Sequence, residues 1–124
     1  MTESGYMPDD AASFYEQLET LLDSGWGIRK KYDALRDAFK RAINQEVGLT
    51  NLNFSGTFAK LDYLIKEKGI SEAESVRLHG TRRTLNTLSE ISDRQLQDSI
   101  GSDVKSAAML VEALLGEPIP KSLR

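Results

Sequence analysis

The stretch from Ile28 to Val47 constrains the fold of this chain most strongly, because its apolar residues repeat at the spacing of one helix face. The members of this stripe are Ile28, Tyr32, Leu35, Phe39, Ala42, Ile43 and Val47. Charged side chains fill most of the remaining positions, so the pattern predicts an amphipathic helix that buries one face. Gly48 is expected to end this helix, because glycine is favoured in the position that follows a helix.

Two further helices are predicted on either side of this one. Pro8, Asp9 and Asp10 favour a helix start, and the helix is expected to run to about Asp23. Its apolar stripe consists of Phe14, Leu18, Leu21 and Leu22. Between the two helices, Trp26 lies in a Gly-Trp-Gly break and is expected to fill the core at a helix corner. A helix over about 57–68 is expected to direct Phe58, Leu61, Leu64 and Ile65 inward.

Two capping-box patterns predict the starts of the last two helices. Ser71-Glu-Ala-Glu74 and Ser92-Asp-Arg-Gln95 each place an acidic or amide residue three positions after a serine. The helix that starts at Ser71 has a sparse apolar stripe, composed of Ala73, Val76, Gly80, Thr84 and Leu88. The helix that starts at Ser92 has a long apolar stripe, composed of Leu96, Ile100, Val104, Ala107, Val111 and Leu114. Gly101 is expected to kink or split this helix, and the prolines of Gly116-Glu-Pro-Ile-Pro120 to end it.

The helical segments together predict an all-α fold, a bundle of four or five helices. Its core is expected to contain Tyr32, Leu35, Phe39, Phe58, Leu61, Leu64, Val111 and Leu114. Residues 1–8 are expected to form a flexible leader, 9–120 a single helical-bundle domain, and 121–124 a tail or the cut end of a domain.

Composition excludes several classes of function. The chain has 124 residues, a net charge of -3 and no cysteine, which rules out disulfides and cysteine-based zinc sites and indicates a cytoplasmic protein. No apolar run approaches the ~20 residues that span a bilayer, so no membrane association is expected. The acidic balance also disfavours general nucleic-acid binding, because phosphate contacts need a basic imbalance.

The sequence carries no recognisable catalytic, cofactor or metal motif. Gly-x-x-x-x-Gly-Lys-[Ser/Thr], Gly-x-Gly-x-x-Gly and Gly-x-Ser-x-Gly are all absent. His79 is the only histidine, and it is expected to lie on the surface of a polar helix. We therefore expect no catalytic residue, no cofactor and no metal ion.

A group of basic residues on the predicted 71–88 helix is the best candidate for a working surface. It consists of Arg77, Arg82 and Arg83, with Asn86 one turn after Arg83. A second basic group, which includes Arg29, Lys30 and Lys31, lies on the Ile28–Val47 helix. Solvated charge with ion pairs, such as Asp37 with Arg41, is the simpler interpretation of such runs.

Four motifs resemble a known family when they are taken in order along the chain. They are Tyr32-Asp-Ala-Leu-Arg36 with Phe39, Phe54-x-x-x-Phe58-Ala-Lys-Leu-Asp-Tyr-Leu-Ile65, Arg83-x-x-Asn86 and Gly116-Glu-Pro-Ile-Pro120. Together they are similar to the helical N-terminal module that precedes the motor in some bacterial superfamily I DNA helicases. That module is itself similar to HEPN-type bundles. The resemblance covers about Ile28 to Pro120 and implies an HEPN-like bundle.

The same resemblance bears on catalysis. Active HEPN RNases carry an Arg-x(4–6)-His motif, and Arg83 matches its arginine. No histidine follows Arg83 at this spacing, because the residues four to seven positions later are Thr87, Leu88, Ser89 and Glu90. None of them is the histidine that supplies the acid or base in these enzymes. The resemblance therefore implies a member that lacks the RNase motif and serves in binding or in dimer formation.

The sequence thus predicts a non-catalytic accessory or interaction module, the N-terminal domain of a larger DNA helicase, that contacts a protein partner or nucleic acid. Three alternatives remain open: a divergent HEPN RNase, a homodimeric scaffold or antitoxin-like protein, and an electrostatic nucleic-acid binder. The scaffold alternative predicts one exposed apolar patch formed by Trp26, Leu49, Leu52 and Phe54.

Overall fold

A computed structural model describes residues 9–50 and 52–124, and within these ranges the regular structure is entirely helical. Its elements are α1 (Ala11–Asp23), α2 (Ile28–Val47), α3 (Thr57–Glu67), α4 (Glu72–Asn86) and α5 (Asp93–Leu115), with the short 3₁₀ turns η1 (Leu88–Glu90) and η2 (Lys121–Leu123). The prediction of an all-α bundle is confirmed, with five α-helices in the described ranges. The leader expected over 1–8 lies outside the described residues.

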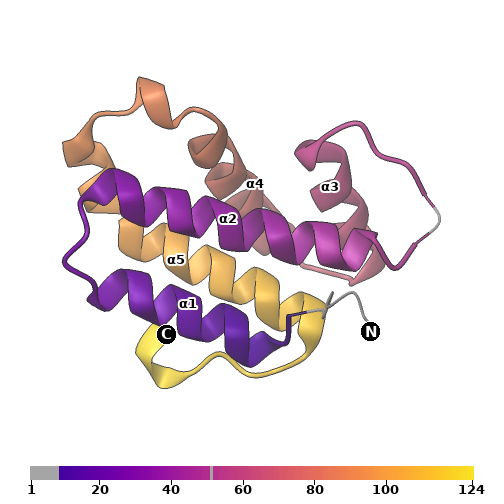
Figure 1. Ribbon diagram of the computed structural model, residues 1–124. Helices are drawn as coiled ribbons and strands as arrows, with labels where there is room; N and C mark the ends of the chain where they lie inside the picture. Colours follow the sequence, from indigo (N-terminus) through magenta and orange to yellow (C-terminus); the bar gives the residue numbers. More distant parts are fainter. Residues whose placement is uncertain (1–8, 51) are drawn as a thin grey trace, which may run out of the picture.

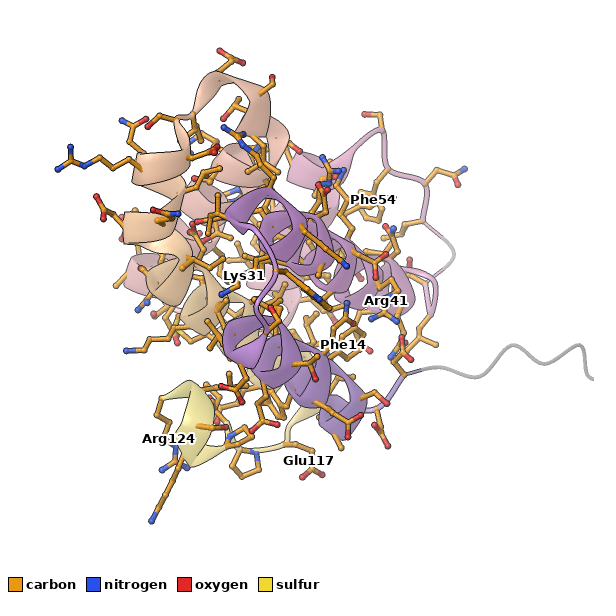
Figure 2. The ribbon with its side chains drawn as sticks, turned by 60° about the vertical axis from the view of Figure 1, so that its left-hand side comes forward. Phe14, Lys31, Arg41, Phe54, Glu117 and Arg124 are labelled. Atoms are coloured by element: carbon orange, nitrogen blue, oxygen red, sulfur yellow. The ribbon has the colours of Figure 1, made fainter. Side chains whose placement is uncertain are left out.

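Three helices form the centre of the bundle, and two lie on its flank. α1, α2 and α5 pack against one another, whereas α3 packs mainly on α2 and α4, and α4 on α3 and α5 (Figure 1). α3 and the connection that precedes it therefore lie on the edge of the molecule, away from α1 and from the C-terminus. Figure 2 shows the same separation, with Phe54 far from Glu117 and Arg124.

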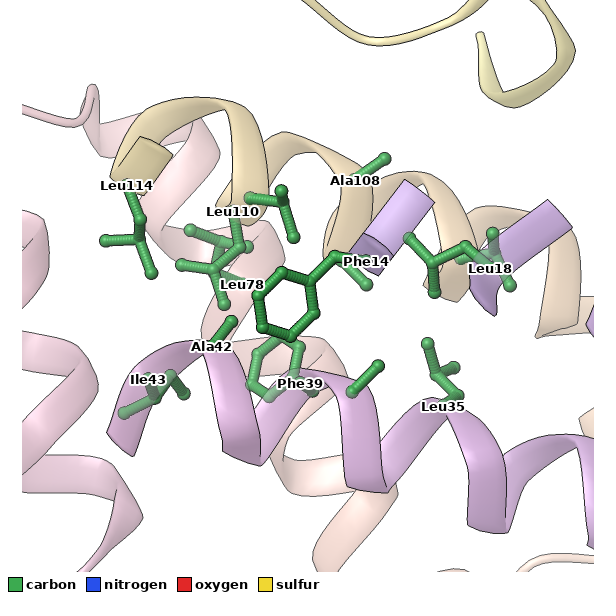
Figure 3. Packing of buried hydrophobic residues seen from close by; sticks show 14 of the residues in the cluster. Phe14, Leu18, Leu35, Phe39, Ala42, Ile43, Leu78, Ala108, Leu110 and Leu114 are labelled. Atoms are coloured by element: carbon green, nitrogen blue, oxygen red, sulfur yellow. The ribbon is translucent and has the colours of Figure 1, made fainter. Parts of the chain in front are cut away.

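The stripe of α2 supplies the middle of the core. Tyr32, Leu35 and Ile43 are fully buried, and Figure 3 shows Phe39 of α2 next to Phe14 of α1, with Leu110 of α5 close by. Each fully buried large apolar side chain contributes about 1.5–3 kcal/mol relative to its exposed state. The predicted core residues of α2 and α5 are confirmed, as are Leu61 and Leu64 of α3. Phe58 is the exception, since it is 57% exposed, and its assignment to the core is wrong.

The polar signals at the helix ends mostly act as expected. Asp10, Ser71 and Ser92 each accept a hydrogen bond at a helix N-terminus, and Ser92 with Gln95 forms a full capping box. Gly116 ends α5 at φ +79°, in the left-handed region. Gly48 follows the last residue of α2, as expected, and has a right-handed conformation at φ -61°. α5 passes through Gly101 as one helix.

The buried face of α4 differs from the predicted one. Leu78, Thr81 and Leu85 are its buried residues, whereas Val76, assigned to the stripe, is 65% exposed. The true face repeats at i, i+3 and i+7 and has a threonine in its middle, so a search for apolar residues selects the opposite side. Thr81 is tolerated there because its hydroxyl donates to Asp103 Oδ1 over 2.8 Å.

The segment after α5 returns to the bundle. Tyr15 of α1 donates its hydroxyl to the carbonyl of Glu117 over 2.6 Å, and Leu123 of η2 is 2% exposed. Residues 121–124, which were expected to be a tail, thus contribute a core side chain. In the described ranges, none of the helices has the length and apolar character needed to cross a membrane.

Candidate functional site on α3 and α4

The structure does not bring the four predicted surface residues of α4 onto one face. Successive residues of a helix are rotated by about 100°, which separates Arg77 from Arg82 by about 140° around the axis. Arg77 turns toward α5, where its Nε donates to Ser106 Oγ over 2.9 Å and its Nη2 to the carbonyl of Ser102 over 3.3 Å. Arg77 therefore ties α4 to α5 and does not share a surface with Arg82.

Arg82 turns the other way, toward α3, and meets a histidine and an aromatic ring there. Its Nε donates to His79 Nδ1 over 3.0 Å, and its guanidinium lies 5.0 Å from the centroid of the Phe58 ring. The rings of Phe58 and His79 are themselves 4.9 Å apart. Three side chains from two helices thus form one stacked cluster.

Asp62 completes this cluster from α3. Its Oδ1 lies 3.9 Å from His79 Nε2, while its Oδ2 pairs with Lys66 over 2.9 Å. The His79 side chain is only 12% exposed, so the prediction of a surface histidine is wrong. α3 covers the ring because Phe58 and Asp62 are one turn apart on the side of α3 that faces α4.

The surroundings of His79 favour its neutral form. Burial, followed by the positive charge of Arg82, lowers the pKa of His79 below its usual 6.5, and Asp62 acts in the opposite direction. Burial and the charge of Arg83 lower the pKa of Arg82. A neutral His79 is required for the observed bond, because only an unprotonated Nδ1 can accept from Arg82.

Arg83 and Asn86 point away from the bundle and are exposed. Arg83 lies two turns after Val76 on the same side of α4. Its guanidinium lies near Gly80, because a Cβ atom added to that glycine would be 4.0 Å from one terminal nitrogen of Arg83. The outer side of α4 therefore carries an exposed valine and an exposed arginine, next to the cluster formed by Phe58, His79 and Arg82.

The large exposed apolar side chains of the described residues are all found in one part of the chain. They are Leu49, Leu52, Phe58 and Val76, each more than half exposed. They belong to the α2–α3 connection, α3 and α4, whereas α1, α2 and α5 have none. The large exposed apolar side chains of the described residues thus belong to the part of the chain that builds the α3–α4 edge.

The single apolar patch expected for a scaffold does not form. Trp26 and Leu49 lie beyond opposite ends of α2, which at 1.5 Å per residue separates them by about 30 Å. Trp26 is half-buried, with Lys30 Nζ 4.6 Å from its ring centroid. Phe54 is half-buried too, with its ring 5.1 Å from that of Tyr63.

The basic group at the start of α2 is partly committed to structure. Arg29 donates to the carbonyls of Leu88 and Ile91 and pairs with Asp93 over 2.8 Å. It thereby holds the connection between α4 and α5 against α2. The ion pair expected between Asp37 and Arg41 is present at 3.1 Å.

A buried polar network behind α4 was not predicted. Asp103 of α5 is 8% exposed, and it accepts from the Tyr32 hydroxyl over 2.6 Å and from Thr81 over 2.8 Å. Ser99 lies 2.8 Å from the same tyrosine oxygen. Half of the signal was present in the sequence, since Tyr32 was assigned to the core and its hydroxyl needs a polar partner there. Thr81 lies outside the predicted stripe of α4, so its part in the network could not be inferred.

The surface also has two open depressions along α1, of about 640 and 500 Å³, which share Glu16 and Glu19. Their linings include several carboxylates and no basic side chain, and they lie away from α3. Over residues 9–50 and 52–124, no three histidine or acidic side chains come together in a way that would hold a metal ion.

The fold defines this protein as an all-α five-helix bundle with an apolar and cationic edge at α3 and α4. Comparisons of the chain with protein-family models, with curated proteins and with solved structures find no match.

Proposed function

We propose that this chain is a non-catalytic interaction module that binds a protein partner through the α3–α4 edge. We call this surface the docking face and define it as Phe58, Val76, His79, Arg82 and Arg83. The observation that carries the proposal is the confinement of large exposed apolar side chains to this edge and to the connection that precedes α3. Exposed apolar clusters bordered by polar groups are typical of protein–protein contact sites.

The composition of the docking face supports a protein partner. Phe58 and Val76 offer apolar area, and aromatic residues and arginine are both enriched at protein–protein interfaces. Arg82 already lies over Phe58, so part of the ordering cost of binding is met before the partner arrives.

The proposal gives His79 a structural role in the docking face. Its Nδ1 accepts from Arg82, its Nε2 faces Asp62, and its side chain is largely covered. A general base has to reach a substrate proton, and neither nitrogen is free to do so.

The resemblance to helicase N-terminal modules extends this proposal to the parent protein. On that basis the bundle is an HEPN-like accessory domain, and its docking face contacts a helicase motor or a protein recruited to it. The five-helix all-α architecture is compatible with this extension, which rests on the sequence motifs alone.

Site-specific photo-crosslinking in the cells that make the protein tests the proposal. A photoreactive amino acid at Val76 should give one discrete protein adduct, and the adduct should disappear when Phe58→Glu is added. The same amino acid at Thr20, an exposed site on α1, should give no such adduct. Circular dichroism of each variant confirms that it is folded.

Three results would contradict the proposal. Equal adducts at both positions, or no adduct at Val76, would show that the docking face is not a specific binding surface. An adduct of two copies of this chain would instead favour the homodimeric scaffold.

A further inference from the structure

We infer that the docking face binds an acidic, apolar protein segment, with a carboxylate of the partner held by Arg82 and Arg83 and a neighbouring apolar side chain placed against Phe58 and Val76. This inference rests on the proposed function and specifies the chemistry of the partner.

The first argument is the unneutralised charge of the two arginines. Arg29, Arg36 and Arg41 each lie within ion-pair distance of an aspartate. Within the described part of the chain, Arg82 and Arg83 have no carboxylate at that distance, although they are adjacent and repel each other. A carboxylate that bound between them would relieve this repulsion and gain charge-assisted hydrogen bonds.

The second argument is the fixed orientation of Arg82. Its Nε is used by His79 at 3.0 Å, and one face of its guanidinium covers Phe58. No hydrogen bond to another described residue occupies its two terminal nitrogens. Those two donors form a planar fork that matches a carboxylate, and His79 and Phe58 hold the fork in place.

The third argument is the apolar surface beside the arginines. Phe58 is 57% and Val76 65% exposed. The Phe58 ring lies against His79, and Val76 lies one turn before His79 on α4. A partner side chain that covered both would remove apolar area from water next to the new ion pair. Exclusion of water strengthens such an ion pair, because the local dielectric falls.

The surrounding charges favour one carboxylate over a polyanion. Asp62 lies 3.9 Å from His79, and Glu72 lies one turn before Val76 on the outer side of α4. A nucleic-acid strand carries one phosphate every ~3.4 Å, so neighbouring phosphates would meet these carboxylates. The chain as a whole carries a net charge of -3, which also opposes a polyanion.

Selection from a phage-displayed library of short random peptides against the full chain tests the inference. The enriched peptides should place Asp or Glu within one turn of Phe, Leu or Trp. Fluorescence anisotropy should show that Arg83→Gln weakens a selected peptide by about tenfold. Lys121→Gln, which removes the same charge from η2 on the far side of the bundle, should change its affinity by less than about twofold.

Several results would overturn the inference. They are the absence of enriched peptides, enrichment of peptides without acidic residues, and peptide binding that Arg83→Gln leaves unchanged. Binding of a single-stranded oligonucleotide that depends on Arg83 would assign the face to nucleic acid. If the Val76 adduct forms but survives Arg83→Gln, the inference fails while the proposed function stands. If no adduct forms at Val76, both fail.

Discussion

Asp103 is the most unusual residue of the core, because a carboxylate is costly to bury without partners. Tyr32 and Thr81 supply them from α2 and α4, so three helices meet at one side chain. Burial, with the hydrogen bond to Asp103, raises the pKa of the Tyr32 phenol. The phenol therefore remains protonated, and so remains a donor, to a higher pH than an unburied tyrosine does.

Removing the donor should leave Asp103 short of one partner. We expect Tyr32→Phe to lower the free energy of unfolding by about 1–3 kcal/mol, measured by urea denaturation. Tyr63→Phe is the matched control, since Tyr63 is half-buried and makes no hydroxyl hydrogen bond to a described residue. Its effect should stay within about 0.5 kcal/mol, and equal losses in both variants would contradict a special role for the network.

His79 makes the stability of the bundle depend on pH. Because its pKa is lowered in the folded state, the unfolded chain binds a proton more readily than the folded one. The contribution of neutral His79 to the free energy of unfolding is complete above 6.5, the pKa of histidine in the unfolded chain. It is lost as the pH falls below that value. Protonation also removes the acceptor of the Arg82 bond.

We therefore expect the free energy of unfolding to decrease between about pH 7 and pH 5, in urea denaturation at several pH values. His79→Gln should flatten this part of the profile. Carboxylates titrate mainly below this range, so they do not account for the loss. An identical slope in the variant would show that other groups cause it.

At the scale of single elements, α5 shows how the same residue type has opposite effects at two positions. Gly101 lies inside the helix with open space where the Cβ of an alanine would lie, whereas Gly116 lies after it with φ +79°. From its place in the sequence, Gly101 is expected to kink or split the helix. It does not, because glycine weakens a helix by only about 1 kcal/mol and the buried stripe of α5 outweighs that cost.

The two glycines give a paired prediction. Gly101→Ala should raise the free energy of unfolding by about 0.5–1 kcal/mol, because alanine is the better helix former and finds no clash. Gly116→Ala should lower it by about 1 kcal/mol, because alanine is strained in the left-handed region. Thermal or urea unfolding measures both, and shifts of the same sign would contradict the assignment.

α4 is the element whose sequence was least informative about its faces. Only Leu78 and Leu85 mark its buried side among large apolar residues, and Val76 competes with them from the opposite side. α3 adds a second ambiguity, since Phe58 continues the apolar spacing of Leu61 and Ile65. α4 offers it no core pocket, so the ring lies at the edge against His79.

At the scale of the whole molecule, the return of the chain after α5 closes the side of the bundle opposite α3. Leu123 is almost fully buried, and η2 packs on α1 and α5. We expect Leu123→Ala to lower the free energy of unfolding by about 2 kcal/mol, the low end for a buried leucine, because a terminal segment relaxes easily.

Lys121→Ala provides the control for this position, since Lys121 is exposed in the same turn. Its effect on the free energy of unfolding should be within about 0.5 kcal/mol. A Leu123→Ala urea midpoint equal to that of the unsubstituted chain would show that residues 121–124 form a tail after all.

Charge is also distributed unevenly over the molecule. Residues 9–27 contain five acidic and no basic residues, whereas residues 49–86 contain six basic and four acidic ones. The acidic depressions along α1 and the docking face therefore lie on different sides of the bundle. A partner that approaches with an acidic surface is repelled by one side and oriented toward the other.

The sequence by itself determined the helices of this protein and most of their ends. The spacing of apolar residues, the capping residues and the glycines are local signals. The helix predicted over Ile28–Val47 and the capping box predicted at Ser92 both agree with the structure residue by residue. These signals act between residues a few positions apart, which is why they can be read from one chain.

Only the tertiary structure decided which side of α4 is buried and where its arginines point. Arg77 is committed to α5, Arg82 to α3, and Arg83 to solvent. The sequence placed these three residues on one surface because proximity along the chain was its only guide. Side chains more than 20 positions away, such as Phe58 and Ser106, set their directions, and such contacts exist only after the helices have packed.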